Sequence, residues 1–169
     1  MSVPPLALLA LQITMSGLAL AWLTHTVVLP ALRAMPSRRA LAAMLWVHVP
    51  RYVPLALLAP GQTDAAADDS AISVIAWGDF TASVLAIAAL VALHRSSRAG
   101  VPWVWVFFVV STVDIVAALS LGLGSGIHEQ ALGFGWYVLT LYVPMVCVSH
   151  GLIGAWLLAG DRLSSRKAA

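Results

Sequence analysis

The sequence predicts an all-α integral membrane protein, a bundle of five transmembrane helices, and two observations carry this prediction. Of its 169 residues, 61% are hydrophobic and only 9% are charged, too few polar side chains to cover a globular protein. The apolar residues also gather in five runs. Each is long enough to cross a hydrocarbon core of about 30 Å, which takes about 20 helical residues. The short polar connections leave no room for a soluble domain, so residues 1–169 are expected to form a single transmembrane domain.

The five expected spans, in chain order, are residues 6–29, 40–58, 71–93, 101–123 and 136–159. The second span is the least apolar, because it contains His48, Arg51, Pro50 and Pro54. A proline inside a helix lacks the N–H that would bond to the carbonyl one turn earlier. We therefore expect a kink in this span, with the freed carbonyls of Trp46 and Pro50 available to Arg51 or to a polar cavity.

Basic residues outside the spans lie on one side of the membrane once five spans are threaded. They fall in the first and third connections and in the tail: Arg33, Arg38, Arg39, Arg95, Arg98, Arg162, Arg166 and Lys167. The second and fourth connections hold instead Asp64, Asp68, Asp69, His128 and Glu129. The positive-inside rule then predicts an N-terminus outside and a C-terminus in the cytoplasm. The expected location is the inner (plasma) membrane of the cell.

Charge and cysteine content exclude two classes of function. The net charge of +2 is carried by short, separated clusters, whereas a nucleic-acid-binding protein gathers Lys and Arg on one face or stripe. The single cysteine, Cys147, allows neither an internal disulfide nor a Cys-based metal site, and it is expected to pack as a small hydrophobic residue. The expected partners are therefore the lipid bilayer and a small molecule or ion, with no nucleic acid.

Three charged residues lie inside the predicted spans. Each of Arg51, Asp79 and Asp114 would cost at least about 2.5 kcal/mol facing lipid at the bilayer centre, so they should face the bundle interior and find partners. With a rise of about 1.5 Å per residue, all three converge in the outer half of the membrane. One arginine against two aspartates leaves a formal charge of minus one. A proton on an aspartate, a protonated His48 or a bound cation would balance it.

A second layer of polar residues is expected closer to the cytoplasm. His48 and His150 each lie about 15 Å from the inner ends of their spans, so they should meet at one depth. Tyr142 adds a hydroxyl on the last span, where Gly151 and Gly154 are spaced to bring helices together. Small and polar residues also share one face on each of two spans: Ala76, Asp79, Ser83 and Ala86, then Ser111, Asp114 and Ala118.

Four functions fit these residues. The first is binding or transport of a proton or a small polar or cationic ligand, with Asp79 and Asp114 as carriers and Arg51 as anchor. Many transporters are built from two inverted halves of equal size, which five helices cannot provide, so a transport path would need a homo-oligomer. The second is a membrane enzyme acting on a lipid, sterol or isoprenoid, with His48 and one aspartate as acid and base.

The third function is a b-type haem protein with His48 and His150 as axial ligands. Apart from haem, no cofactor and no metal ion is expected. The fourth is a buried polar knot that fixes helix register without chemistry.

The run His48-x-x-Arg51-Tyr52, followed by Gly78-Asp79, Asp114 and Tyr142-x-Pro144, resembles small multi-pass membrane proteins of bacteria that are uncharacterised. The resemblance covers most of the chain. It implies a membrane location and brings no activity, cofactor or substrate.

Overall fold

The computed structural model describes residues 4–62, 69–95, 98–126, 133 and 135–167, and every element in this part of the chain is helical. Five helices are long and apolar enough to cross a membrane: Pro5–Arg33, Ser37–Leu58, Ser70–Arg95, Gly100–Gly124 and Gly135–Ala159. They begin and end within a few residues of the predicted spans, so five spanning-length helices are confirmed. Asp64, Asp68, His128 and Glu129 lie outside the described residues.

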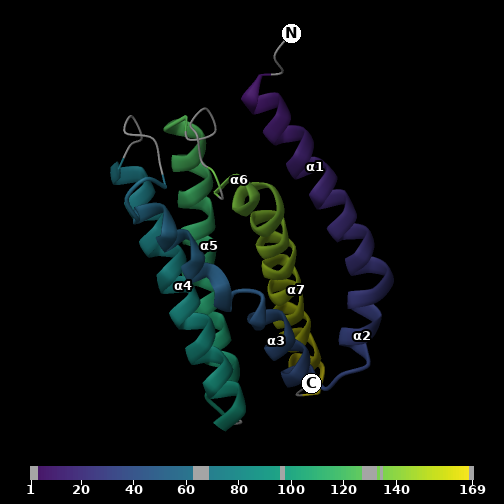
Figure 1. Ribbon diagram of the computed structural model, residues 1–169. Helices are drawn as coiled ribbons and strands as arrows, with labels where there is room; N and C mark the ends of the chain where they lie inside the picture. The colour runs from purple at the N-terminus through teal and green to yellow at the C-terminus, as the bar shows by residue number, and fades with distance from the viewer. Residues whose placement is uncertain (1–3, 63–68, 96–97, 127–132, 134, 168–169) are drawn as a thin grey trace.

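The helices form two groups side by side (Figure 1). In one group, α4 (Asp69–Arg95) and α5 (Gly100–Gly124) pack along each other, and the 3₁₀ helix η2 (Val49–Leu58) packs against α4. In the other group, α7 (Val143–Lys167) contacts both α1 (Pro5–Leu23) and α3, the first half of the second span. The two termini lie at opposite ends of the bundle, as an odd number of spans requires.

The second span is broken in the middle. It begins as α3 (Ser37–Trp46) and continues, after two residues, as the 3₁₀ helix η2 (Val49–Leu58). Pro50 and Pro54 cannot donate a backbone N–H, so the α-helical pattern cannot continue through them. The kink predicted at these prolines is therefore confirmed. The irregular stretch is also longer than expected, because η2 has ten residues and 3₁₀ runs of more than three or four residues are uncommon.

Side-chain hydroxyls from neighbouring helices bond to the carbonyls around this break. The three bonds run from Ser83 to the carbonyl of Val49 at 2.5 Å, from Tyr142 to Val47 at 3.0 Å and from Ser149 to Met44 at 2.9 Å. A non-helical backbone inside a membrane is stable only where such partners satisfy it. Of the two roles expected for the carbonyls of Trp46 and Pro50, bonding to Arg51 gains no support, since the guanidinium contacts Asp79, Ser111 and Asp114.

The first and last spans each contain a π-helical turn just before a proline. The turn η1 (Thr24–Val28) precedes Pro30 and leads into α2 (Leu29–Arg33). The turn η4 (Val138–Tyr142) precedes Pro144 and joins α6 (Gly135–Tyr137) to α7. In both spans the extra residue of the turn accommodates the missing proline N–H while the helix continues.

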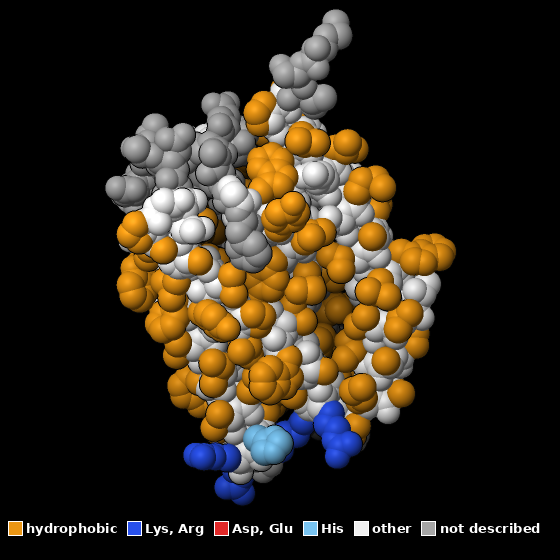
Figure 2. Space-filling view, viewed as in Figure 1, with side chains coloured by type: hydrophobic (Ala, Val, Ile, Leu, Met, Phe, Trp, Pro, Cys, Tyr) orange, Lys and Arg blue, Asp and Glu red, His pale blue; other side chains and the backbone are white. Residues whose placement is uncertain are grey.

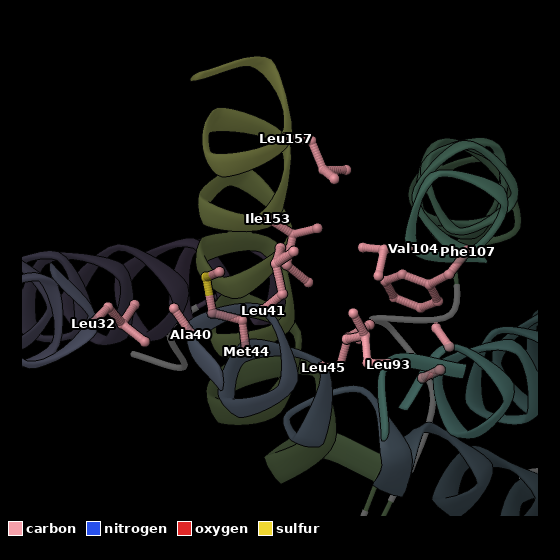
Figure 3. Close-up of a cluster of buried hydrophobic side chains, with 12 residues drawn as sticks. Leu32, Ala40, Leu41, Met44, Leu45, Leu93, Val104, Phe107, Ile153 and Leu157 are labelled. Atoms are coloured by element: carbon pink, nitrogen blue, oxygen red, sulfur yellow. The ribbon is translucent and has the colours of Figure 1, made fainter. Parts of the chain in front are cut away.

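A cluster of buried hydrophobic side chains joins the two helix groups (Figure 3). Its members come from α2, α3, α4, α5 and α7, among them Leu41, Leu45, Leu93, Phe107 and Ile153. Leu45, Phe107 and Ile153 are fully buried. The cluster holds the helices together beneath the polar residues described below.

Gly154→Ala is expected to destabilise the protein, whereas Gly151→Ala on the same helix is not. A methyl group at position 154 would lie 2.8 Å from the ring of Phe108, while nothing lies within 4 Å of one at position 151. Overpacking of this kind costs about 1–3 kcal/mol. Thermal unfolding of both variants in mild detergent measures the difference, and equal unfolding midpoints would contradict the packing of Phe108 on α7.

Candidate functional site

Arg51 of η2 is held between two aspartates from different helices. Its Nε donates to Oδ1 of Asp79 on α4 at 2.7 Å, and its Nη2 forms an ion pair with Oδ2 of Asp114 on α5. Its Nη1 donates to the hydroxyl of Ser111, one turn before Asp114, at 2.5 Å. Arg51 itself is only 2% exposed. The structure thus brings together the three charges of the predicted spans that the sequence predicted to converge.

The close approach of α4 and α5 at this point depends on Gly78. A methyl group at this position would lie 1.9 Å from Oδ1 of Asp114, so any side chain would displace the carboxylate. The neighbouring small residues Ala76, Ser83 and Ala86 on α4 are buried, as the shared face predicted. Glycine and small residues therefore provide the space in which the ion pairs form.

A cavity of about 100 Å³ lies above the ion pairs, toward the N-terminal end of the bundle. Arg51, Asp79, Tyr142 and Cys147 supply its polar lining, and apolar residues of η2, α4, α5, η4 and α7 line the rest. Since a buried water needs about 10–15 Å³ on such a measure, the cavity has room for several waters or a small ligand. Cys147 was expected to pack as a hydrophobic residue, but it is exposed and borders this space.

The 3₁₀ geometry of η2 aligns the ion pairs with the cavity. A 3₁₀ helix has three residues per turn, so side chains three apart lie one above another. The residues of η2 that line the cavity are Arg51, Pro54 and Leu57, which follow this spacing. An α-helix would rotate these side chains progressively away from one another. The break at the prolines therefore places Arg51 at the base of an apolar wall.

Electrostatically, the site carries more acid than base. One guanidinium faces two carboxylates, which leaves a formal charge of minus one in an apolar surrounding. Asp79 and Asp114 are 17% and 11% exposed, so little solvent screens them. Both Arg51 contacts to Asp79 use Oδ1, and Asp79 is the aspartate that lines the cavity. Asp79 is therefore the carboxylate placed to meet a ligand in the cavity.

The two histidines meet, as predicted, but apart from this cavity. The ring centroids of His48 and His150 lie 5.8 Å apart, and both rings contact Phe107 at 4.9 and 6.1 Å. Phe108 stacks on His150 at 4.5 Å. Neither histidine belongs to the cavity lining. The structure thus separates a carboxylate layer, open to a cavity, from a histidine layer enclosed by aromatic rings.

A threonine hydroxyl contacts the ring of His150. The hydroxyl of Thr112 lies 2.7 Å from the carbonyl oxygen of Phe108 and 2.8 Å from Nε2 of His150. Among the described residues, Nδ1 of His150 and both ring nitrogens of His48 are buried without a hydrogen-bond partner.

This packing disfavours haem between the two rings. A haem held by two histidines extends its macrocycle in the plane between the imidazoles. Phe107 occupies that plane, since its ring lies at comparable distances from His48 and His150. The pairing of His48 with an aspartate as acid and base gains no support either, because neither ring nitrogen of His48 has a hydrogen-bond partner among the described residues.

Tyr142 is the remaining residue of the predicted site. Its hydroxyl donates to the carbonyl of Val47, and its side chain also lines the cavity. It therefore links the last span to the broken span beside the ion pairs. The sequence indicated Tyr142 as a site residue but not Gly78 or Cys147. The role of Gly78 depends on the close packing of α4 against α5, and that of Cys147 on the cavity, and no local sequence pattern encodes either feature.

Arg51→Ala is expected to destabilise the protein more than the triple replacement Arg51→Met, Asp79→Asn and Asp114→Asn. The single change leaves two buried carboxylates without a partner, at a cost of about 3–5 kcal/mol, whereas the triple change removes the charges together. Unfolding free energies in mixed micelles compare the two variants. Equal losses would show that the three residues do not act as one cluster.

Comparison with known proteins extends the description to a family. No curated protein and no solved structure matches the chain. A family match covers residues 8–158 and thus reaches from the first span to the last, in agreement with the resemblance noted in the sequence. The chain belongs to the family described as Domain of unknown function (DUF8737).

Proposed function

We propose that this protein binds a small monovalent cation in the cavity above Arg51 and carries it across the inner (plasma) membrane. One observation carries the proposal: two carboxylates share a single guanidinium, and one of them, Asp79, lines a cavity. In the proposed roles, Asp79 meets the cation, Arg51 anchors Asp79, and Asp114 holds Arg51 in place.

The charge of the cluster favours a cation over an anion or a neutral ligand. Burying an uncompensated charge in an apolar surrounding is costly, so the surplus carboxylate must bind a positive group. A proton fulfils this role when the cavity is empty. A cation that enters would displace the proton, so the two compete for one site.

The walls of the cavity favour a cation with an apolar body. Ile75, Ile115, Leu119 and Leu139 surround the space above Asp79. A small organic ammonium ion would place its charge against the carboxylate and its carbon atoms against these side chains. A strongly hydrated inorganic ion would find too few oxygen ligands there, because it needs several to replace its water shell.

The broken second span favours transport over static binding. Transporters commonly place their substrate sites at discontinuous helices near the middle of the membrane. Here Arg51 lies on the 3₁₀ half of a span interrupted at Val47 and His48. A 3₁₀ stretch within a helix is also a common hinge. Movement of η2 would shift Arg51 relative to Asp79 on α4 and to the cavity.

We also propose that the N-terminus lies outside and the C-terminus in the cytoplasm. Basic side chains gather at one end of the bundle, below a belt of hydrophobic side chains (Figure 2). We call this the basic end; here α2 ends, α3 begins, α4 ends and α5 begins, and the basic residues in or beside these helix ends are Arg33, Arg38, Arg39, Arg95 and Arg98. The positive-inside rule assigns such an end to the cytoplasm. The cavity then faces the outer half of the membrane.

A small ammonium ion is expected to stabilise the protein through Asp79. Tert-butylammonium chloride, at constant ionic strength, should raise the thermal unfolding midpoint, since a ligand at one hundred times its Kd stabilises by about 2.7 kcal/mol. Asp79→Asn should abolish the response, and Ala118→Leu should abolish it by filling the cavity. Ala155→Leu on an exposed position of α7 is the matched control and should respond as the native protein does.

Two further readouts make this test decisive. Tert-butyl alcohol has the same apolar body without the charge, so it should give no comparable rise. The only cysteine, Cys147, borders the cavity, so the ammonium ion should slow its reaction with N-ethylmaleimide. Equal stabilisation by the alcohol, or an unchanged response of Asp79→Asn, would support the alternative of a polar knot without a ligand.

Cysteine labelling is expected to confirm the orientation. In a Cys147→Ser background, Gln62→Cys should react with a membrane-impermeant maleimide in intact cells, because the second connection lies outside. Arg98→Cys should react only after the membrane is opened. Labelling of position 98 from outside would reverse the proposed orientation, and labelling of both positions would contradict the five-span threading.

A further inference from the structure

The basic end contains a second hollow, separate from the cavity above Arg51. It measures about 740 Å³ and lies between α3 and α4. Arg38 and Arg39 line it from the first turn of α3, and His94 and Arg95 line it from the last turn of α4. The described residues that line it include no acidic side chain. Figure 2 shows this end of the molecule with its Arg and His side chains grouped below the hydrophobic belt.

The hollow changes character with depth in the membrane. Beyond the basic residues its walls are apolar, formed by Trp46 on α3 and by Ile87 and Val91 on α4. These three side chains are 63%, 45% and 44% exposed, so they present their surfaces to whatever fills the hollow. A basic rim above an apolar wall matches a molecule with an anionic head and a hydrocarbon tail.

The local helix structure favours an anion at the rim. Helix N-termini attract negative charge, yet α3 has Arg38 and Arg39 in its first turn, no acidic residue there and no side-chain cap. The N-terminus of α5 lies close to these arginines. Nη2 of Arg38 is 2.9 Å from the position that a Cβ atom would take on Gly100, the first residue of α5. The first turn of α5 also lacks acidic residues. An anion at the rim would interact favourably with both helix ends and the arginines.

We infer that this hollow binds an acidic phospholipid, with the phosphate of the headgroup at Arg39 and Arg95 and an acyl chain along Trp46, Ile87 and Val91. Basic pockets between transmembrane helices are suited to such headgroups. A free phosphate would gain the charge contacts alone, whereas a lipid also covers the apolar wall. The inference is independent of the proposed cation site, because the two cavities share no lining residue.

Native mass spectrometry of the full chain in mild detergent tests this inference. The protein is titrated with phosphatidylglycerol and with phosphatidylcholine that carries the same acyl chains. We expect phosphatidylglycerol to bind at least tenfold more tightly. The double variant Arg39→Gln, Arg95→Gln should weaken its binding about thirtyfold, since each basic residue near the surface contributes about a fivefold change.

The matched control is the double variant Arg33→Gln, Arg98→Gln. It removes the same charge from the same end, but neither residue lines the hollow, so the affinity for phosphatidylglycerol should change less than threefold. Trp46→Ala should weaken binding of both lipids equally by removing contact with the chain. Equal losses in the two double variants, or equal binding of the two lipids, would overturn the inference and leave only a general attraction to charged membranes.

Discussion

Arg51 binds Asp79 on α4 and Asp114 on α5 at once, and this double ion pair requires three helices to meet at one depth in an apolar medium. An unpaired arginine or aspartate there would be strongly unfavourable, so each of the three residues stabilises the buried charges of the others. The surrounding structure meets the same requirement. Gly78 lets α4 and α5 approach, and the prolines of the second span turn its helix so that Arg51 reaches both carboxylates.

The broken second span joins structure to the proposed function. Its interruption frees backbone carbonyls, and hydroxyls on α4, η4 and α7 bond to them, so the second span is anchored to both helix groups. The same interruption aligns Arg51, Pro54 and Leu57 into one wall of the cavity. An unbroken α-helix would have neither recruited the hydroxyls nor formed this wall. The site is therefore a product of backbone irregularity as much as of charge.

Much of this arrangement follows from the sequence because membrane helices obey few rules. Length and hydropathy predict five spans, and a constant rise per residue predicts that Arg51, Asp79 and Asp114 meet and that His48 and His150 form a second layer. The rest depends on packing between distant segments. The prolines indicate a kink but not ten residues of 3₁₀ helix. The histidine spacing does not reveal that Phe107 packs against both rings and Phe108 against that of His150.

Arg51 is synthesised before either of its partners, because Asp79 and Asp114 follow it by 28 and 63 residues. Its span also has the lowest mean hydropathy of the five, 1.4. When this segment first leaves the ribosome, it carries an arginine that has no counter-ion and a backbone break that has no hydroxyl donors. In the proposed membrane location, its own hydrophobicity would contribute less to membrane insertion than that of any other span, and the helices made after it would supply the partners that retain it in the bilayer. Insertion of the first four spans would then be a coupled process, completed when α5 delivers the second carboxylate.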